Sequence, residues 1–367
     1  MKLPVFVSYE YLDACDEVPP ELTQKLLVLE LHRILVFPER FVFGTFQTSP
    51  YLPRPYLSVF REYLLHPATR AWLHAVICTA EGRTVAERMV SEGTPLHIDD
   101  FHGIYTPVEM NPGKHLAHLR LSTTLTPKNL DVIWNTYKPA PSDVPPPPRH
   151  SPATTILLDR RERSGAQQPH SLLLFPEYEK PLRRHDLDRL HAAIGTQFSP
   201  KELVNKENRD REIARAHYTG YTRSVKKREG YEDGLIALIG VLQHLKAVPN
   251  VAAWLRDGGL MEAAGAKPDA AAWFDRPAVF DVWRKRGYAV VAELGLALEP
   301  GIVNDKEHMV KIARDALDLL ESKPPPSLQP KKRGDKAVSR NKARKRQKER
   351  DQAIDMLRTL TGNTFLN

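Results

Sequence analysis

The residues of this 367-residue chain best suited to a chemical role are the cations of one short run, KKRGDKAVSRNKARKRQKER, at positions 331–350. Its eleven basic side chains are Lys331, Lys332, Arg333, Lys336, Arg340, Lys342, Arg344, Lys345, Arg346, Lys348 and Arg350. Only Asp335 and Glu349 oppose them, so the run carries +9 while the rest of the chain, whose total is +8, carries −1. Like charges at this density oppose packing into a core and favour contact with a polyanion.

Two roles fit this basic run. It can neutralise the phosphates of a nucleic acid, which gives salt-dependent affinity without a sequence code. It also fits the two-cluster pattern of a nuclear import signal, because Lys331 and Lys332 are followed, after ten residues, by the cations of ARKRQ at 343–347. The two roles can share the same residues. The alternatives are a solvated tail without a role and a tail attracted to acidic lipid, which lacks support from any acylation motif or strongly apolar helix.

A second basic patch lies at 215–228, where cations alternate with tyrosines. Its members are Arg215, Tyr218, Tyr221, Arg223, Lys226, Lys227 and Arg228. Cations can follow a phosphate backbone while tyrosine rings stack on unpaired bases, each stack contributing ~1–3 kcal/mol. The competing interpretation is that the tyrosines, three residues apart, face the interior of a helical bundle.

One segment, GTPLHIDDFHG at 93–103, has a metal-binding pattern. His97 and Asp99 are two ligands of the kind found in two-histidine, one-carboxylate iron sites, with His102, His115 or His118 as the third. An iron-dependent oxygenase is therefore the second alternative for the function. The spacing opposes it, because such enzymes place the distal histidine tens of residues further on and need a many-stranded double sheet, which is not predicted here.

Other catalytic signatures are missing from the sequence. It contains no GxxxxGK[ST] phosphate loop, no GxGxxG following a strand and no GxSxG elbow. The two cysteines, Cys15 and Cys78, cannot form a disulfide framework and are interpreted as free thiols in a reducing compartment. We therefore expect a non-enzymatic protein with no cofactor and no metal.

The elements that must position these residues suggest four regions. An α+β domain is expected at 1–138, a proline-rich linker at 139–170, a mainly α-helical domain at 171–322, and a basic, largely disordered tail at 323–367 that ends in a short amphipathic helix. Four consecutive prolines at 145–148 favour the extended polyproline conformation, which identifies the linker. Apolar periodicity supplies the remaining assignments. Strands are expected at 5–12 and 115–125, and helices at 19–36, 56–65, 68–80, 126–137, 199–218, 231–248, 251–259, 278–298, 305–323 and 349–363.

These patterns together favour a non-enzymatic nuclear protein that associates with RNA or DNA through its basic tail, as a ribonucleoprotein component or a viral nucleoprotein would. Its expected partners are nucleic acid, a nuclear import receptor, and a protein or second copy docked on the terminal helix. The first alternative is a nuclear scaffold subunit that uses the tail only for import. Membrane contact is not expected, because no stretch reaches the eighteen or so apolar residues of a span.

Overall fold

The structure is a computed structural model that describes residues 7–17, 24–38, 41–43, 46–48, 51–92, 94–110, 127–137, 150–193, 220–228, 230–269, 271–302, 351 and 354. The chain forms two compact units. One unit comprises Met1–Pro38 and Tyr51–Ile302, and the other comprises Glu39–Pro50 and Val303–Asn367. The pocket and the ion pairs discussed below lie within the first unit.

The described strands are β1 (Lys25–Leu29), β2 (Val36–Pro38), β3 (Phe41–Phe43), β4 (Phe46–Thr48), β5 (Tyr51–Pro53), β6 (Leu73–Cys78), β7 (Ile104–Tyr105), β8 (Thr155–Asp159) and β9 (Leu172–Leu174). The described α-helices are α1 (Tyr9–Asp16), α2 (Leu57–Leu65), α3 (Pro67–Arg70), α4 (Arg83–Ser91), α5 (Pro107–Met110), α7 (Leu130–Thr136), α8 (Lys180–Ala193), α10 (Gly220–Lys227), α11 (Gly234–Leu245), α12 (Val251–Arg256), α13 (Gly259–Glu262) and α14 (Pro277–Glu293). Short 3-10 helices span Ile98–Asp100, Pro152–Thr154, Glu162–Gly165, Pro169–Ser171 and Trp273–Asp275.

Five parallel strands form the central sheet in the order β7-β6-β1-β8-β9. In β1, Val28 pairs with Val76 of β6 on one side and with Leu157 of β8 on the other. All five residues of β1 are buried, as expected for a parallel strand whose two faces are both covered. Two smaller antiparallel pairs, β2 with β5 and β3 with β4, lie in the sequence between β1 and α2.

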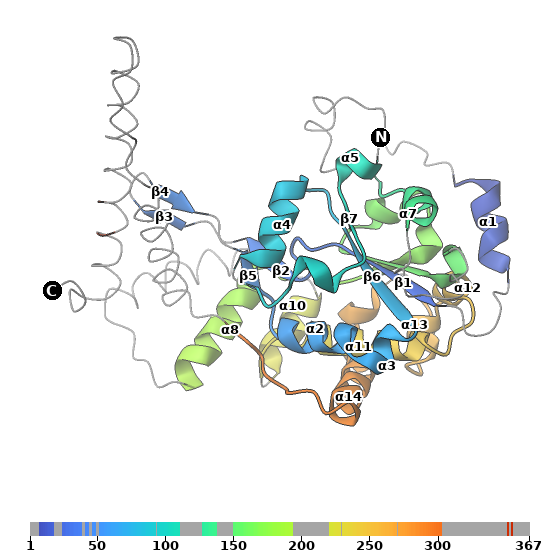
Figure 1. Ribbon diagram of the computed structural model, residues 1–367. Helices are drawn as coiled ribbons and strands as arrows, with labels where there is room; N and C mark the ends of the chain where they lie inside the picture. The colour runs from blue at the N-terminus through green and yellow to red at the C-terminus, as the bar shows by residue number, and fades with distance from the viewer. Residues whose placement is uncertain are drawn as a thin grey trace, which may run out of the picture. The chain divides into compact units, whose positions relative to one another are not determined.

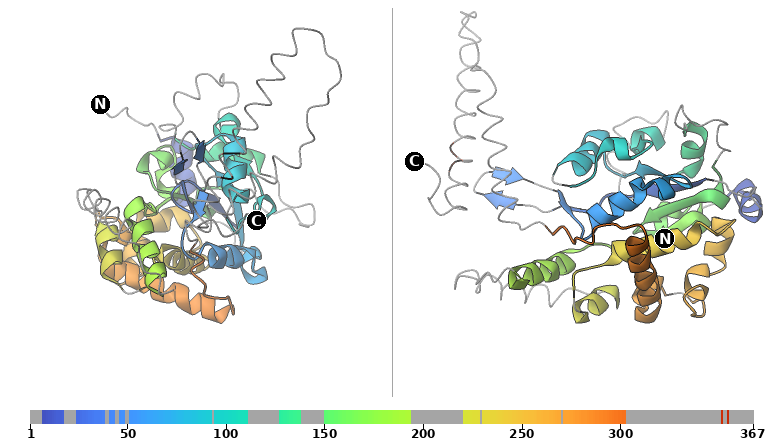
Figure 2. Two further views of the ribbon diagram at one scale, coloured as in Figure 1. Left: turned by 90° about the vertical axis from the view of Figure 1, so that its left-hand side faces the viewer. Right: turned by 60° about the horizontal axis from the view of Figure 1, so that its bottom comes forward.

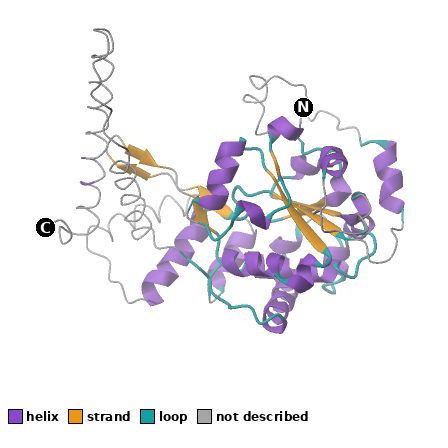
Figure 3. Ribbon diagram, viewed as in Figure 1, coloured by secondary structure: helices purple, strands orange, loops and turns teal. Residues whose placement is uncertain are grey.

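Helices cover both faces of this sheet (Figure 1, Figure 3). Leu26, Val28 and Leu157 pack with Leu130 and Ile133 of α7 on one face. The alternate strand residues belong to a larger core that includes α2 and α11. Both views in Figure 2 place α14 (orange) on the side of α2 (blue) and away from α5 and α7 (teal and green). The connection from β1 to β6 contains α2, which covers one face of the sheet, and the connection into β8 contains α7, which covers the other face. The sheet is therefore doubly wound, with the change of face at β1.

The long helices α11 and α14 pack against each other with very close backbone contact. A Cβ atom added at Gly240 would collide with the carbonyl oxygen of Trp283, and one added at Gly287 would collide with that of Ile236. Glycine is needed at both positions because any side chain would separate the helices.

A buried ion pair links β5 to the start of α11. The Arg54 guanidinium donates to both carboxylate oxygens of Glu232, at 2.7 Å each, and both side chains have no exposed surface. Its third nitrogen donates to the carbonyl oxygens of Ile34 and Pro176. Every polar group of the pair is therefore satisfied, as a buried charge requires.

The structure corrects three assignments made from sequence. Residues 5–12 were expected to form a strand, but α1 begins at Tyr9, with the Ser8 hydroxyl accepting a hydrogen bond from the Tyr11 N–H. The predicted helices at 19–36 and 68–80 are wrong, because their apolar cores form β1 and β6, the central strands of the sheet. A short strand buried on both faces is apolar in every position, so its pattern resembles that of a buried helix.

The helices predicted around 56–65, 126–137, 231–248, 251–259 and 278–298 are confirmed as α2, α7, α11, α12 and α14, with shorter bounds. The predicted strand at 115–125 and the predicted helices at 199–218 and 305–323 lie outside the described residues, as does nearly all of 349–363. None of the helices in the described part of the chain is both long enough and apolar enough to cross a membrane.

The region 139–170, expected to be a linker, supplies the sheet strand β8. Residues before and after it share one compact unit. The chain does combine helices and strands, as predicted, but the strands of its main sheet are parallel, so the fold is α/β with a five-stranded parallel sheet. The basic tail at 323–367 lies outside the described residues except for Asp351 and Ile354.

Candidate ligand site at the carboxyl edge of the sheet

Acidic residues stand at or just beyond the carboxyl ends of three neighbouring strands of the sheet. Glu30 directly follows β1, Asp159 is the last residue of β8, and Glu81 lies three residues beyond β6. Because the strands are parallel, their carboxyl ends meet at one edge, and the three carboxylates gather there. This edge contains the point at which the winding of the sheet reverses, between β1 and β8. In open α/β sheets, ligands bind at that point.

A pocket of about 110 Å³ lies at this edge. Residues at or just beyond the carboxyl ends of β1, β6, β7 and β8 line it, among them Glu30, His32, Thr79, Glu81, Met110 and Asp159. Its volume exceeds that of one water site several times over. The position of the pocket and the topology of the sheet therefore indicate the same site.

Lys128 lines the pocket and bridges the acids at the carboxyl ends of β1 and β8. Its ammonium nitrogen lies 2.9 Å from a Glu30 oxygen and 2.7 Å from an Asp159 oxygen, and all three side chains are at most 7% exposed. The Lys128 backbone N–H donates to the Ser164 carbonyl oxygen, which fixes the residue just ahead of α7. Burial alone would lower the pKa of Lys128, but Glu30 and Asp159 outweigh it and raise that pKa, so the ammonium stays charged.

Other donors also bind the two carboxylates. The Glu30 oxygen that faces away from Lys128 accepts the Thr79 hydroxyl at 2.9 Å and the backbone N–H groups of Leu31 and His32. Asp159 accepts the backbone N–H of Arg161 at 3.0 Å, and although burial opposes it, Lys128 holds the pKa of Asp159 below its usual value. Asp159 is thus held ionised by the protein itself, and Glu30 has protein donors on both of its oxygens.

Glu81 differs from these two carboxylates. It is half-buried, and its carboxylate has no hydrogen-bond partner among the residues that the structure describes. Burial, and next the Glu30 charge, raise its pKa above the usual value. Glu81 is therefore an acceptor that a ligand can use.

His32 contributes an uncharged imidazole. Burial and the nearby Arg160 lower the pKa of His32 to about 4, so the ring is neutral at pH 7. The next residue, Arg33, has a φ of 63°, and its N–H donates to the Val36 carbonyl oxygen in a tight turn. A left-handed backbone at a non-glycine residue is uncommon, and here it holds the chain that leaves β1 beside the pocket.

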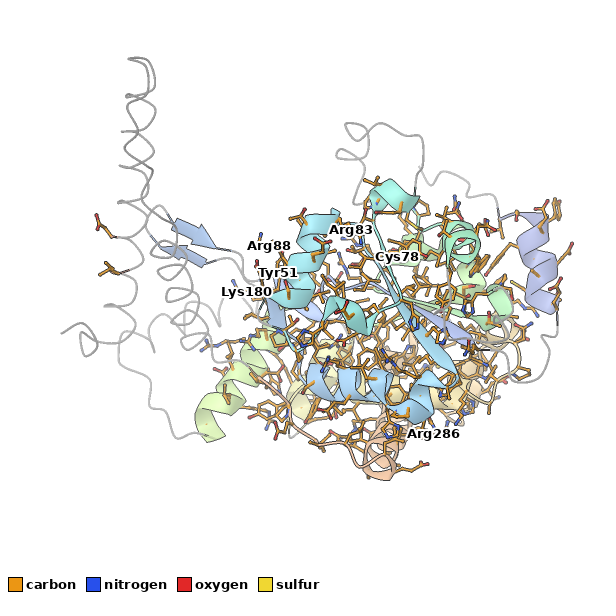
Figure 4. The ribbon with its side chains drawn as sticks, viewed as in Figure 1. Tyr51, Cys78, Arg83, Arg88, Lys180 and Arg286 are labelled. Atoms are coloured by element: carbon orange, nitrogen blue, oxygen red, sulfur yellow. The ribbon has the colours of Figure 1, made fainter. Side chains whose placement is uncertain are left out.

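The remaining lining is apolar. Cys78, Ala80, Pro107, Met110 and Pro127 contribute to it. Burial raises the pKa of Cys78 to about 12, so its thiol is protonated and acts as an apolar group. In Figure 4, Cys78 lies inside the body of the fold, and Arg83 and Arg88 extend from α4. The pocket thus offers an apolar surface, one free carboxylate and one buried ammonium.

The chain matches no protein-family model and no curated protein. The function must therefore be argued from the site itself. Among the described residues, no group of three or more histidine, cysteine or acidic side chains has the arrangement of a metal site. The chemistry that the pocket supports is the recognition of an organic ligand with both apolar and polar parts.

The candidate residues from the basic run, 331–350, lie outside the described residues, and their role stays a prediction. In the second patch, Arg215 and Tyr218 also lie outside, while Lys226 and Lys227 are exposed on α10. Tyr221 is buried and its hydroxyl donates to Glu232, so its ring offers no face to a base. Arg228 pairs with Asp233 at 3.1 Å and lies over the Phe280 ring.

The proposed iron ligands are not brought together in the described part of the chain. His97 and Asp99 are exposed, and the His97 N–H donates to Asp100, which pairs with Arg61. His102 stacks on His74 with ring centroids 4.4 Å apart. His115 and His118 lie outside the described residues.

Sequence reasoning missed Glu30, Glu81, Lys128 and Asp159. Three segments carried the signal: LLVLE, HAVICTAE and TTILLD are apolar runs that each lead to an acid. A buried parallel strand followed by a polar residue has this form. Recognising the first two runs as strands would have predicted acids clustered at one sheet edge.

Proposed function

We propose that this chain binds a nucleoside-type ligand in the pocket at the carboxyl edge of its parallel sheet. The observation that carries the proposal is the place of the pocket, where the winding of the sheet reverses between β1 and β8. The free Glu81 carboxylate follows the strand next to β1 and suits the hydroxyl groups of a ribose. The apolar residues Ala80, Pro107 and Met110 suit the face of a base.

The ligand is expected to lack a diphosphate. Dinucleotide sites place a glycine-rich turn and a helix N-terminus directly after the first strand. Here Gly44 is the sole glycine between Glu30 and Pro50, and α2 begins only at Leu57. The chain that leaves β1 therefore offers no cradle for a diphosphate.

Calorimetric titration of the purified chain with adenosine, guanosine, cytidine and uridine tests this function. Binding of at least one nucleoside is expected, with the loss of that binding in Ala80→Trp, whose indole fills the pocket. The matched control is Ala292→Trp on the exposed surface of α14, which should bind as the native chain does. Failure of all four nucleosides to bind, or equal binding by Ala80→Trp, would contradict the proposal.

A second candidate function is association with RNA or DNA in the nucleus. The concentration of eleven of the 53 basic residues of the chain in 331–350 favours it. Deletion of 331–350 should abolish retention on random RNA or DNA and should exclude the protein from the nucleus. Affinity of the full chain should fall steeply as salt rises. Loss of nuclear import with unchanged nucleic-acid retention would instead favour a scaffold whose tail serves only for transport.

A further inference from the structure

Two carboxylates of the pocket have acceptor oxygens that the described part of the protein does not use. Asp159 Oδ2 accepts no hydrogen bond there, although the Lys128 ammonium lies 2.7 Å away in an ion pair. The Asp159 side chain is 2% exposed, so this oxygen is not hydrated at the surface. Glu81, half-buried in the same pocket, is the second such carboxylate. Because a buried acceptor without a donor is costly, both groups favour a ligand that brings N–H or O–H donors.

The ion pairs of the pocket also leave a negative charge uncompensated. Lys128 is a single ammonium shared between two carboxylates, those of Glu30 and Asp159. Glu81 adds a third carboxylate to the lining. A ligand that supplies one more cation would therefore give two cations and three carboxylates at this edge of the sheet.

The two arginines of the pocket lining do not supply that cation. The Arg160 guanidinium pairs with the Glu177 carboxylate, which lies outside the lining. Burial raises the pKa of Glu81 most, and the Glu30 charge comes next, acting more strongly than the opposing charge of either Arg160 or Arg161. The potential at Glu81 is thus set by its acidic neighbour, which favours a cationic ligand group over an anionic one.

Building on the nucleoside site proposed above, we propose that the ligand is an amino-nucleoside whose 5′ substituent carries an ammonium group that donates to Asp159. An ammonium supplies both the N–H donor that Asp159 Oδ2 lacks and the missing positive charge. The strands β6 and β8 flank β1, so their carboxyl ends are two strand spacings apart, roughly 10 Å. A ribose bound through its hydroxyl groups to Glu81, beyond β6, can direct its 5′ substituent towards Asp159 at the end of β8.

The test compares nucleosides that differ only at the 5′ position. The full chain is titrated calorimetrically at pH 7 with 5′-amino-5′-deoxyadenosine, adenosine and 5′-deoxyadenosine, with adenosine replaced by whichever nucleoside binds best. A hydrogen bond between charged groups should make the amine bind about tenfold or more tightly than either neutral nucleoside.

Variants assign this preference to Asp159. Asp159→Asn keeps the shape of the side chain and removes its charge, while Glu30 remains beside Lys128 as its counter-ion. The variant should bind the amine and adenosine equally, with an adenosine affinity within about threefold of the native value as evidence of an intact pocket. If it does not bind adenosine, Glu30→Gln and Lys128→Met are added, which leaves no unpaired charge among the three residues, and the same equality is expected. Asp99→Asn, at an exposed site, is the matched control and should retain the preference.

Two results would overturn the inference. One is that the native chain binds the amine no more tightly than adenosine. The other is an undiminished preference for the amine in the Asp159 variants. Either result leaves the nucleoside site standing, whereas the failure of every unmodified nucleoside to bind overturns the proposed function and this inference with it.

Discussion

The buried ion pair between Arg54 and Glu232 gives the sharpest prediction about stability. Glu232→Gln keeps the shape of the side chain but removes its charge, leaving the Arg54 guanidinium without a counter-ion. Both residues are fully buried and bonded at 2.7 Å through two parallel hydrogen bonds. Breaking such a pair costs about 3–5 kcal/mol, a large part of the ~5–15 kcal/mol that stabilises a typical domain.

Urea unfolding followed by tryptophan fluorescence measures this loss. The matched control is Glu92→Gln, which breaks the Arg88–Glu92 pair at the C-terminal end of α4; the two side chains are 49% and 50% exposed. That change should cost at most about 0.5 kcal/mol. Combining Glu232→Gln with Arg54→Met should recover much of the lost stability, because the uncompensated charge is then gone. If Glu232→Gln costs no more than the control, the reasoning about this buried pair is wrong.

Three further predictions concern pH and packing. Burial, and next the Glu232 charge, raise the pKa of Asp186 to about 7, so the folded state keeps a proton that the unfolded state releases near pH 4. The free energy of unfolding should therefore fall as pH rises from 4 towards 7. Asp186→Asn should remove this pH dependence from the urea midpoints measured at pH 4–8. Burial lowers the pKa of His150 to about 4, so between about pH 6.5 and pH 4 only the unfolded state protonates this imidazole, and the free energy of unfolding falls towards pH 4. His150→Gln should make this fall shallower in the same series of urea midpoints. An unchanged pH dependence would contradict the burial of a neutral His150. Gly287→Ala should destabilise the fold by at least about 1–3 kcal/mol, because the added methyl group meets the α11 backbone. The control Gly82→Ala, at a position with open space, should cost about 1 kcal/mol or less. Similar melting temperatures for the two variants would refute the close contact between α11 and α14.

Whether a helix or strand could be predicted from the sequence depended on the period of its apolar pattern. The segments that became α2, α11 and α14 are long or amphipathic enough to be recognised as helices. The predictions for the segments of β1 and β6 were wrong because burial on both faces removes the apolar–polar alternation that marks a strand. Mistaking these two strands for helices hid the parallel sheet, and with it the edge on which the pocket lies.

The pocket depends on contacts that no sequence window contains. Lys128 and Glu30 are 98 residues apart, and their pairing exists only because α7 begins beside the carboxyl ends of β1 and β8. The buried state of Tyr221 likewise depends on Glu232 and on packing against Phe280. By contrast, the excess charge of the basic run is a property of composition alone and needs no fold to be detected.

The antiparallel pairing of β2 with β5 gives the chain a modular junction. Pro38 pairs with Tyr51 across these two strands, so the residues on either side of segment 39–50 are neighbours. Both strands belong to the first unit. A segment joined through two adjoining strand ends can be shortened, lengthened or exchanged with little effect on the sheet that supports it. Evolution or an engineer can thus vary residues 39–50 and keep the five-stranded parallel sheet intact.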